Sequence, residues 1–412
     1  MKFRLTSLEK KWVLYDVGNS AFTLLVSTLI PIYFNSLAEQ AGMSSVNYLA
    51  YWGYAISLST LLVALLGPIS GAASDKKGRK KMLFTLSILV GAIGCLALGL
   101  AKQWMIFLIV FVIAKTCYSL SLIIYDSMLV DVTTEERMDS VSSQGFAWGY
   151  IGSCIPFIIC LLLVLNAGKI GISMGMAMMI SFVIVAAWWV GVSLPFLKVY
   201  EQKYYVTRSE EKRGLLSQLG NTLKEMAKDK RILLFMIAFF FYIDGVYTII
   251  DMSTAYGSAL GLDSTGLLLA LLVTQFVAFP SAIIMGRLAR KVKSELLITV
   301  CIIAYFCIAV FAVFMSQQIH FWILAIGVGM FQGGIQALSR SYFTKIIPPE
   351  KTGEYFGFLD ICGKGASLMG TLVMSAVTQI TGRQQLGVGA IALFFLVGLV
   401  FFRMSAARGE QI

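Results

Sequence analysis

Charged side chains are scarce in this chain. Only 13% of its 412 residues are Asp, Glu, Lys or Arg, whereas 58% are hydrophobic and the mean hydropathy is +0.81. A water-soluble protein of this length has too little interior to hide so much apolar surface, whereas a protein surrounded by lipid does not have to hide it. The composition therefore excludes an ordinary soluble protein and predicts a membrane protein.

Residues typical of catalytic and metal sites are also few. The chain has one histidine, and its seven cysteines lie inside apolar runs without paired spacing. That pattern is typical of small buried hydrophobic side chains and excludes a disulfide framework or a cysteine metal site. The sequence contains no phosphate-binding loop of the Walker type and no soluble domain that could hold ATP. We expect no enzyme activity, no cofactor, no metal, and transport driven by a gradient.

Long apolar runs, by contrast, are abundant. A helix needs roughly 20 mostly apolar residues to cross a bilayer, and twelve uncharged runs reach that length between charged or turn-rich breaks. They centre on residues 12–36, 48–73, 81–101, 104–130, 141–166, 171–197, 231–257, 264–289, 295–316, 320–346, 353–380 and 385–403. The sequence predicts an all-α membrane protein with twelve transmembrane helices.

Basic residues are distributed unevenly over the loops between these runs. With both termini in the cytoplasm, 28 of the 33 Lys and Arg residues fall in cytoplasmic segments. This bias is the usual determinant of membrane topology, so we expect a multi-pass protein with both termini cytoplasmic. The net charge of +11 then reflects juxtamembrane clusters that face anionic membrane lipids, and we expect no nucleic-acid partner.

The chain divides into two similar halves. Motif "GAASDKKGRKK" (71–81) follows the second run and "GRLARKVKSE" (286–295) follows the eighth, an offset of 215. "YDSMLVDVTTEE" (125–136) and "SRSYFTKIIPPE" (339–350) are related by an offset of 214. Two matching offsets indicate a duplication, and duplicated six-helix halves that meet around a midplane site are the architecture of a carrier.

The longest polar stretch separates these halves. Within it Leu215, Leu219, Leu223 and Met226 recur at helical spacing, which predicts an amphipathic helix on the cytoplasmic membrane surface. We expect three units: an N-terminal six-helix bundle at 1–197, a cytoplasmic linker at 198–230 and a C-terminal six-helix bundle at 231–412.

Residues 71–81 resemble the signature loop of the major facilitator superfamily, which joins the second and third helices. The shared elements are Gly71, Asp75, Gly78 and the basic Arg79. The resemblance implies that these residues hold and release the cytoplasmic gate and do not contact the substrate. Physically, glycines permit close packing and a turn, and an aspartate can cap or pair with a neighbouring helix end.

Longer stretches resemble the vacuole-effluxer-like branch of that superfamily. They are "WVLYDVGNSAF" (12–22), "YDSMLVDVTTEERMDSVSSQGFAWGYIGS" (125–153), "FYIDGVYTI" (241–249) and "GGIQALSRSYFTKIIPPEKTGEYFGF" (333–358). The resemblance runs over nearly the whole chain and implies the major facilitator fold of two pseudo-symmetric six-helix bundles. Fungal members are implicated in releasing amino acids from the vacuole. This chain lacks a large vacuolar-type insertion, which favours a bacterial inner (cytoplasmic) membrane.

Charges within the apolar runs mark candidate site residues. A charge at the bilayer centre costs about 2.5–3.5 kcal/mol on insertion scales, so such residues usually face a cavity or a partner. We expect Asp244, Asp251, Lys115 and Lys364 to line the central cavity, with Asp360 on the same helix face as Lys364. Opposite charges across a cavity suit a zwitterion such as an amino acid, or a polar lipid headgroup. Alternatively, one carboxylate carries a coupling proton, or Lys115 and Asp244 form a permanent ion pair.

Two further pairs lie toward the cytoplasmic ends of the runs. Asp16 and Asn19 are three residues apart in the first run and share a helix face, either as part of the same substrate or proton site or as a polar pair that bonds helix ends. Asp126 and Arg340 occupy equivalent places in the repeat. We expect them to be gate residues, with ordinary interface charge as the alternative.

Together these features predict a monomeric secondary transporter that works by alternating access and exports a small polar solute such as an amino acid. The Met-rich segment "ISMGMAMMI" (172–180) and the many aromatic residues would equally suit an amphiphile. A lipid or lysolipid translocase is therefore the alternative function. A sensor or scaffold that does not transport is disfavoured, because intramembrane charges in both halves are costly without a pathway to serve.

Overall fold

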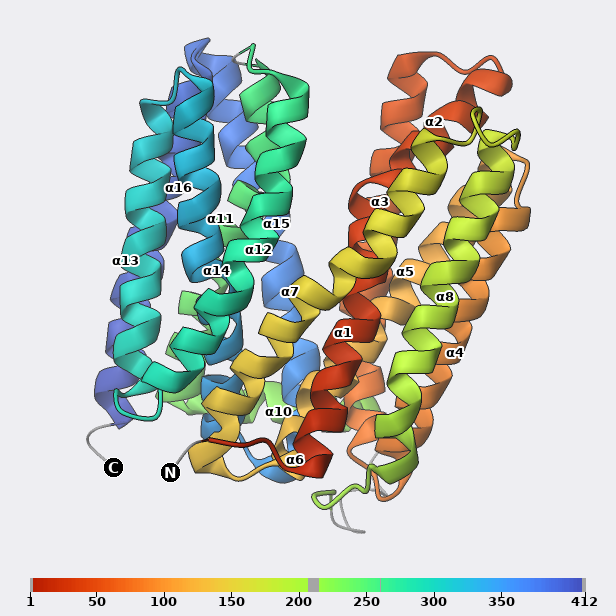
Figure 1. Ribbon diagram of the computed structural model, residues 1–412. Coiled ribbons are helices and arrows are strands. Elements are labelled where there is room, and N and C mark those ends of the chain that lie inside the picture. The colour runs from red at the N-terminus through yellow and green to blue at the C-terminus, as the bar shows by residue number, and fades with distance from the viewer. Residues whose placement is uncertain (1–2, 207–214, 260, 410–412) are drawn as a thin grey trace.

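The computed structural model describes residues 3–206, 215–259 and 261–409, and the described chain is helical throughout apart from its connecting loops (Figure 1). Twelve spans in it are long and apolar enough to cross a membrane. The fold is thus all-α and transmembrane, as the composition predicts. The helices of the N-terminal half are α1 (Ser7–Ser27), α2 (Leu29–Gln40), α3 (Ser45–Ser74), α4 (Arg79–Leu100), α5 (Trp104–Ser127), α6 (Leu129–Val132), α7 (Glu135–Leu165) and α8 (Met174–Val199).

The C-terminal half repeats this arrangement. Its helices are α11 (Lys230–Ala259), α12 (Ser264–Leu288), α13 (Ser294–Val313), α14 (Gln318–Ile346), the 3-10 helix η1 (Pro349–Lys351), α15 (Thr352–Thr381) and α16 (Gln384–Gly409). In chain order, α10 (Leu215–Lys228) stands between the two halves. The boundaries at residues 198 and 231 stay predictions for the extent of each unit.

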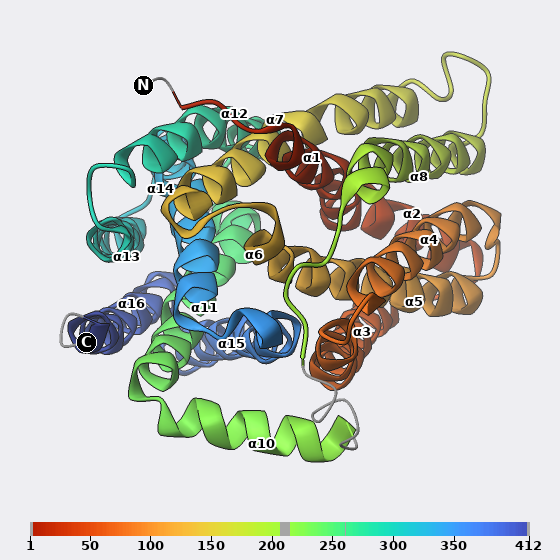
Figure 2. The ribbon, with the colours of Figure 1, turned by 90° about the horizontal axis from the view of Figure 1, so that it is seen from below.

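The two halves form separate bundles that lie side by side. They meet at the end of the molecule where both chain termini lie, here called the termini end, and diverge toward the opposite end (Figure 1). Seen from the termini end, α10 runs along one edge of the molecule (Figure 2), where it contacts α3, α11 and α15. The linker helix therefore touches both halves.

The first span contains a break that its apolar pattern did not predict. A capping box of Thr6 and Glu9 starts α1, because each side chain binds the other residue's backbone N–H. The helix is interrupted at Thr28 and resumes as α2. Pro31 explains the interruption, since its ring has no N–H to donate and clashes with the carbonyl four residues earlier.

Burial is inverted relative to a soluble protein. Large apolar side chains such as Leu100 and Ile380 are 72% and 84% exposed, whereas Asp75, Lys80 and Asp244 are fully buried. In water this pattern would be unfavourable on both counts. In a bilayer the exposed side chains face lipid. The buried charges mark positions where burial of a charge costs free energy and a partner or a function is expected.

Candidate functional site

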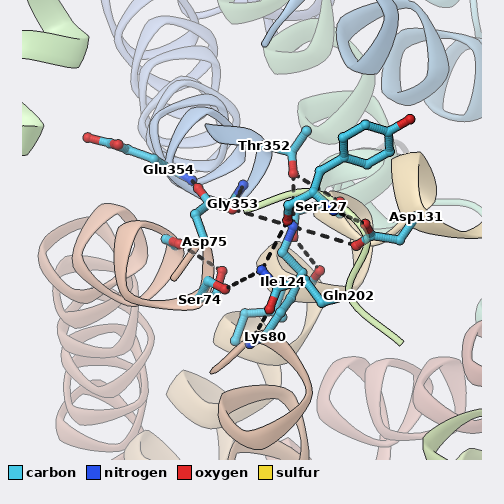
Figure 3. Close-up of polar contacts among 12 residues, drawn as sticks. Ser74, Asp75, Lys80, Ile124, Ser127, Asp131, Gln202, Thr352, Gly353 and Glu354 are labelled. Carbon is cyan, nitrogen blue, oxygen red and sulfur yellow. Dashed lines mark hydrogen bonds and ion pairs between the residues drawn. The ribbon is translucent and has the colours of Figure 1, made fainter. Parts of the chain in front are cut away.

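The signature loop joins the two halves at the termini end through Asp75. This residue ends α3, and its two carboxylate oxygens accept hydrogen bonds from the backbone N–H groups of Gly353 and Glu354, each at 2.9 Å. Those N–H groups belong to the first turn of α15, which has no partners for them within its own helix. Asp75 of the N-terminal half therefore caps a helix of the C-terminal half (Figure 3).

Lys80 supplies the positive charge beside this carboxylate. Its Nζ lies 3.4 Å from Asp75 Oδ1 and 3.8 Å from Asp131 Oδ2, and it donates a hydrogen bond to Thr352 Oγ1 at 3.0 Å. The hydroxyl of Thr352 in turn donates to the carbonyl of Ser127 at 3.1 Å. A fully buried lysine is tolerable only when paired and hydrogen-bonded, and here both conditions hold.

The segment after α8 holds this cluster together. Gln202 accepts a hydrogen bond from the N–H of Gly78 at 2.9 Å and donates to the carbonyl of Ser74 at 3.2 Å. Asp131 accepts the N–H of Lys203 at 2.9 Å and the hydroxyl of Tyr200 at 2.5 Å. The loop between α3 and α4 is thus tied to α6 and to the start of the linker (Figure 3).

The Asp75 carboxyl is electrostatically sensitive. Burial raises its pKa to about 6, although Lys80 and the two N–H groups of α15 favour the charged form. The proton occupancy of this junction therefore changes in mildly acidic conditions, not only at strongly acidic pH.

Glycine permits the close approach of α3 and α15. A Cβ on Gly71 would overlap the carbonyl oxygen of Gly353. In the other half, a Cβ on Gly286 would lie 2.6 Å from Cβ of Ser143 on α7. The offset of 215 found in the sequence thus relates two glycine contacts, α3 with α15 and α12 with α7, on either side of the pseudo-symmetric junction.

Gly71→Ala is expected to prevent closure at the termini end, because backbone atoms of α15 cannot move aside as a flexible side chain could. Spin labels on Lys81→Cys and Lys291→Cys, one exposed position per half, should report a longer mean distance in this variant, in a background with Cys307→Ser. Gly53→Ala on the same helix is the control, since an added Cβ there meets nothing within 4 Å. An unchanged distance in Gly71→Ala would show that the close contact of Gly71 with α15 is not required for closure at the termini end.

Arg340 forms a second junction between the halves. From α14 it makes ion pairs with Asp126 at 2.9 Å and Asp16 at 3.4 Å, and its Nε donates to Ser142 Oγ at 2.9 Å. Its guanidinium also lies 4.7 Å from the ring centroid of Trp12 and 4.4 Å from that of Phe146. One buried arginine of the C-terminal half therefore enters a pocket of carboxylates and aromatic rings made by the N-terminal half.

Asp139 forms a third junction. This residue of α7 pairs with Lys345 of α14 at 2.5 Å and accepts hydrogen bonds from Ser341 at 2.5 Å and Ser294 at 2.6 Å. The charge sign is reversed relative to Arg340, because here the N-terminal half supplies the carboxylate to a cation and hydroxyls of the C-terminal half. All three junctions lie toward the termini end of the bundles.

Deeper in the molecule, four charged residues lie on helices from both halves. On α15, Lys364 pairs with Asp360 at 2.6 Å, and their side chains are 27% and 21% exposed. On α5, Lys115 lies 5.9 Å from the Phe111 ring centroid and interacts electrostatically with Lys364 and with Asp251 of α11. Lys115 of one half thus lies within electrostatic range of Lys364 and Asp251 of the other, and Lys364 is paired with Asp360.

Asp244 stands apart from these charges. Its Oδ1 accepts hydrogen bonds from the backbone N–H of Gly370 at 3.0 Å and from the Thr248 hydroxyl at 3.1 Å, and its Oδ2 is buried without a hydrogen-bond partner. In the described part of the chain no cation lies within ion-pair distance of it. The permanent pair with Lys115 that the sequence left open is absent from this conformation.

The remaining candidates from the sequence fall in different places. Asp16 and Asn19 share a helix face, but Asp16 belongs to the Arg340 junction, while the Asn19 amide donates to the Tyr15 carbonyl at 2.9 Å. Gly78 adopts a positive φ of 74° at the start of α4, a conformation that favours glycine. Arg79 is exposed, and its neighbour Lys80 occupies the buried position instead.

Sequence reasoning missed Lys80, Asp131, Asp139 and Lys345. Lys80 was one of five cations in a basic loop, and only three-dimensional packing separates the buried cation from the exposed ones. Asp139 carried a weak signal, since it follows the repeated segment at 125–136 by three residues. Among the described residues no group of three or more His, Cys, Asp and Glu side chains is placed to hold a metal ion.

Comparison with known proteins identifies the family. The profile of the family described as "Vacuole effluxer Atg22 like" matches residues 7–411. The uncharacterized MFS-type transporter YxiO of Bacillus subtilis (strain 168) is 42% identical over 406 residues, which cover 97% of this chain and 95% of that protein. Autophagy-related protein 22 of Eremothecium gossypii is 22% identical over 393 residues, covering 86% of this chain and 76% of that protein.

A solved structure agrees at the level of fold. The transporter FucP, a Major Facilitator Superfamily member crystallised in the outward conformation, superposes with a TM-score of 0.74 at 13% identity and 97% coverage of both chains. At that identity the likeness shows the fold alone. With the family profile and YxiO, it leads to one conclusion: this chain is a transporter of the major facilitator superfamily and belongs to the vacuole effluxer Atg22-like family.

Proposed function

We propose that the protein is a secondary transporter that works by alternating access and exports a small zwitterionic solute such as an amino acid. The observation that carries this proposal is the group of Lys115, Asp251, Asp360 and Lys364, which lie on α5, α11 and α15 and therefore on both halves. A solute that bridges these helices would contact both bundles at once. That is the requirement for a site which alternately faces the two sides of a membrane.

The chemistry of the four side chains favours a zwitterion. The ammonium groups of Lys115 and Lys364 would bind a carboxylate, and Asp251 and Asp360 would bind an ammonium group. The Lys364–Asp360 pair is only partly buried, so it can exchange its internal partner for a solute at modest cost. Tyr247 of α11 interacts electrostatically with both Asp251 and Asp360 and would add an aromatic and hydroxyl surface.

The distribution of the junctions supports alternating access. At the termini end the halves are held by hydrogen bonds and ion pairs of Asp75, Arg340 and Asp139, which can break and re-form, and toward the other end the bundles diverge (Figure 1). We assign the termini end to the cytoplasm on the basis of the basic loops, so this conformation faces outward. We place the protein as a monomer in a bacterial inner membrane.

Efflux is the direction we propose. The family to which the chain belongs is described as vacuole effluxer-like, and release from a compartment is the property that this description names. Asp16 and Asn19, which the sequence grouped with the solute site, are assigned to the gate side because of the Asp16–Arg340 contact.

A thermal-shift measurement on purified protein in detergent tests the solute class. An amino acid that binds the folded state and is present at a concentration of about 100 times its Kd should stabilise the protein by about 2.7 kcal/mol. Lys364→Gln should abolish that stabilisation, whereas Lys169→Gln, an exposed lysine in the loop between α7 and α8, should retain it. Stabilisation by lysolipids alone would replace this proposal with a lipid translocase. No stabilisation by any amino acid or dipeptide would exclude the zwitterion class.

A stabilising amino acid would then be examined for transport. In proteoliposomes loaded with the labelled compound, the wild type should release it and Lys364→Gln should release less than about a tenth as much, a loss that corresponds to about 1.4 kcal/mol. Equal release by both proteins would separate binding from transport and contradict the assignment of Lys364.

A further inference from the structure

Asp244 is a fully buried carboxyl, and one of its two oxygens has no hydrogen-bond partner. It lies midway along α11, its side chain is fully buried, and its recorded partners are the Thr248 hydroxyl and the Gly370 N–H. We propose that Asp244 is a proton-binding carboxyl that couples the transport cycle to a proton gradient, a role separate from solute contact. This inference rests on the transport cycle proposed above and deepens it.

Among the described residues, no neighbouring cation is placed to stabilise an ionised Asp244. On its own helix the titratable neighbours are Tyr247 and Asp251, and on α15 they are Asp360 and Lys364, which pair with each other. On the helices that contact α11, the other charged groups lie toward the termini end, and the one histidine, His320, lies at the opposite end of α14. The charged groups are Lys224, Glu225 and Lys228 of α10, Arg287 of α12, Glu295 of α13, Arg340 and Lys345 of α14, Glu354 of α15, and Arg403 and Arg408 of α16. In the described residues none of these lies within ion-pair distance of Asp244. A carboxylate buried without a counter-ion binds a proton in preference to remaining charged.

The geometry fits a proton better than a metal ion or a solute ammonium. Both donors use Oδ1, so only the orphan Oδ2 is available. Metal cations require several oxygen ligands, whereas a proton requires one lone pair. A Cβ on Gly370 would overlap Oδ1 of Asp244 and Oγ1 of Thr248. The α15 backbone therefore packs tightly against Oδ1, which leaves no room for a cation to bridge both carboxylate oxygens.

One helix connects this carboxyl to the rest of the cycle. The N-terminal turn of α15 is capped by Asp75, its next turns carry Asp360 and Lys364, and Gly370 donates to Asp244. Hydrogen bonds to a charged carboxylate are stronger than those to a neutral carboxylic acid. Binding of a proton to Oδ2 would therefore weaken the attachment of α11 to α15, and release of the proton would restore it. In this way proton occupancy would bias the helix that carries both the gate contact and the solute charges.

Infrared difference spectroscopy on the purified protein tests the proposal without any solute. On moving from mildly alkaline to mildly acidic buffer, the wild type should gain carboxylic-acid C=O stretching bands, and one of these should be missing in Asp244→Asn. Asp75→Asn is run in parallel because burial places the pKa of Asp75 at about 6, so its band must be assigned separately. Thr248→Val keeps the carboxyl but removes one donor, and should retain the band at a shifted frequency.

The same buffers are then used with spin labels at Lys81→Cys and Lys291→Cys. The label distance in the wild type should change with pH, and Asp244→Asn should lose the larger part of that change while Lys169→Gln keeps it. A full set of carboxyl bands in Asp244→Asn, or an undiminished pH response, would overturn the proposal. A distance change produced by sodium chloride but not by choline chloride at fixed pH would also overturn it, in favour of a sodium site.

These results are independent of the solute assignment. If amino acids fail to stabilise the protein but the Asp244 band and pH response are present, the proton site stands and the solute class falls. If amino acids stabilise it and the band is absent, the reverse holds.

Discussion

Arg340→Gln is expected to shift the molecule away from the conformation described here, in which the halves meet at the termini end. The substitution leaves Asp16, whose side chain is only 10% exposed, and Asp126 facing each other without their shared cation. Breaking a buried ion pair by removing one partner typically costs 3–5 kcal/mol. Because the Asp126 side chain is 29% exposed, we expect a cost at the lower end of that range, about 3 kcal/mol. This cost corresponds to about a hundredfold change in the ratio of closed to open molecules.

Distances between spin labels at Lys81→Cys and Lys291→Cys measure this shift. The distance distribution should lengthen in Arg340→Gln and remain unchanged in Arg403→Gln, an exposed arginine on α16. The double variant Arg340→Gln with Asp126→Asn should recover part of the closed population, because it removes one of the two uncompensated carboxylates. A distribution identical to the wild type in Arg340→Gln would show that this arginine does not hold the gate.

Lys80→Met is expected to destabilise the protein even more strongly. Lys80 is fully buried between Asp75 and Asp131, which are also fully buried. Methionine matches the length of the lysine stem but leaves two carboxylates facing each other in a medium of low dielectric constant. The expected loss is at the upper end of the range for buried pairs, about 5 kcal/mol, and should appear as a lower melting temperature in detergent.

Arg79→Met is the matched control, because it changes the adjacent residue of the same basic loop at an exposed position. Its melting temperature should stay close to that of the wild type, since exposed charges contribute little. Adding Asp131→Asn to Lys80→Met should restore part of the lost stability by removing one carboxylate. Equal effects of Lys80→Met and Arg79→Met would contradict the assignment of the buried cation.

Between them, the two substitutions separate different parts of the contact between the halves at the termini end. Lys80 has both of its ion-pair partners, Asp75 and Asp131, in its own half and reaches the other half through one hydrogen bond to Thr352. Arg340 has both of its ion-pair partners in the opposite half. Lys80→Met should therefore lower overall stability as well as weaken closure. Arg340→Gln should mainly change the balance between conformations.

The architecture was predictable because it depends on the local composition of the chain and on its internal repeat. Twelve apolar runs and the offset of about 215 residues required no knowledge of packing, and the described chain shows twelve spans of that kind in two bundles. The break at Thr28 was missed because Pro31 lies within an otherwise continuous apolar run. Hydropathy averages over such a residue, whereas the helix responds to its missing N–H and its ring.

Candidate site residues were found as types and positions, but not as partners. Asp126 and Arg340 were singled out because they occupy equivalent places in the repeat, and the structure brings them to 2.9 Å. Asp16 was grouped with the solute charges, and the structure places it beside Arg340, because α1 and α14 both pack against α7. Arg79 fitted the signature motif, yet it is exposed. The buried cation is Lys80, the residue after Arg79 in the helix that begins after the turn at Gly78.

The sequence by itself determined that this protein lies in a membrane, has twelve spans in two related halves and carries charges at unfavourable positions within them. These properties depend on composition and on repeats along the chain. Only the tertiary structure decided which charges neutralise one another across the halves, which lysine of the basic loop is buried, and that Asp244 has no counter-ion among the described residues. The reason is that a charge pairs with whatever lies within a few ångströms, and helix packing brings together residues such as Asp75 and Gly353 that are 278 positions apart.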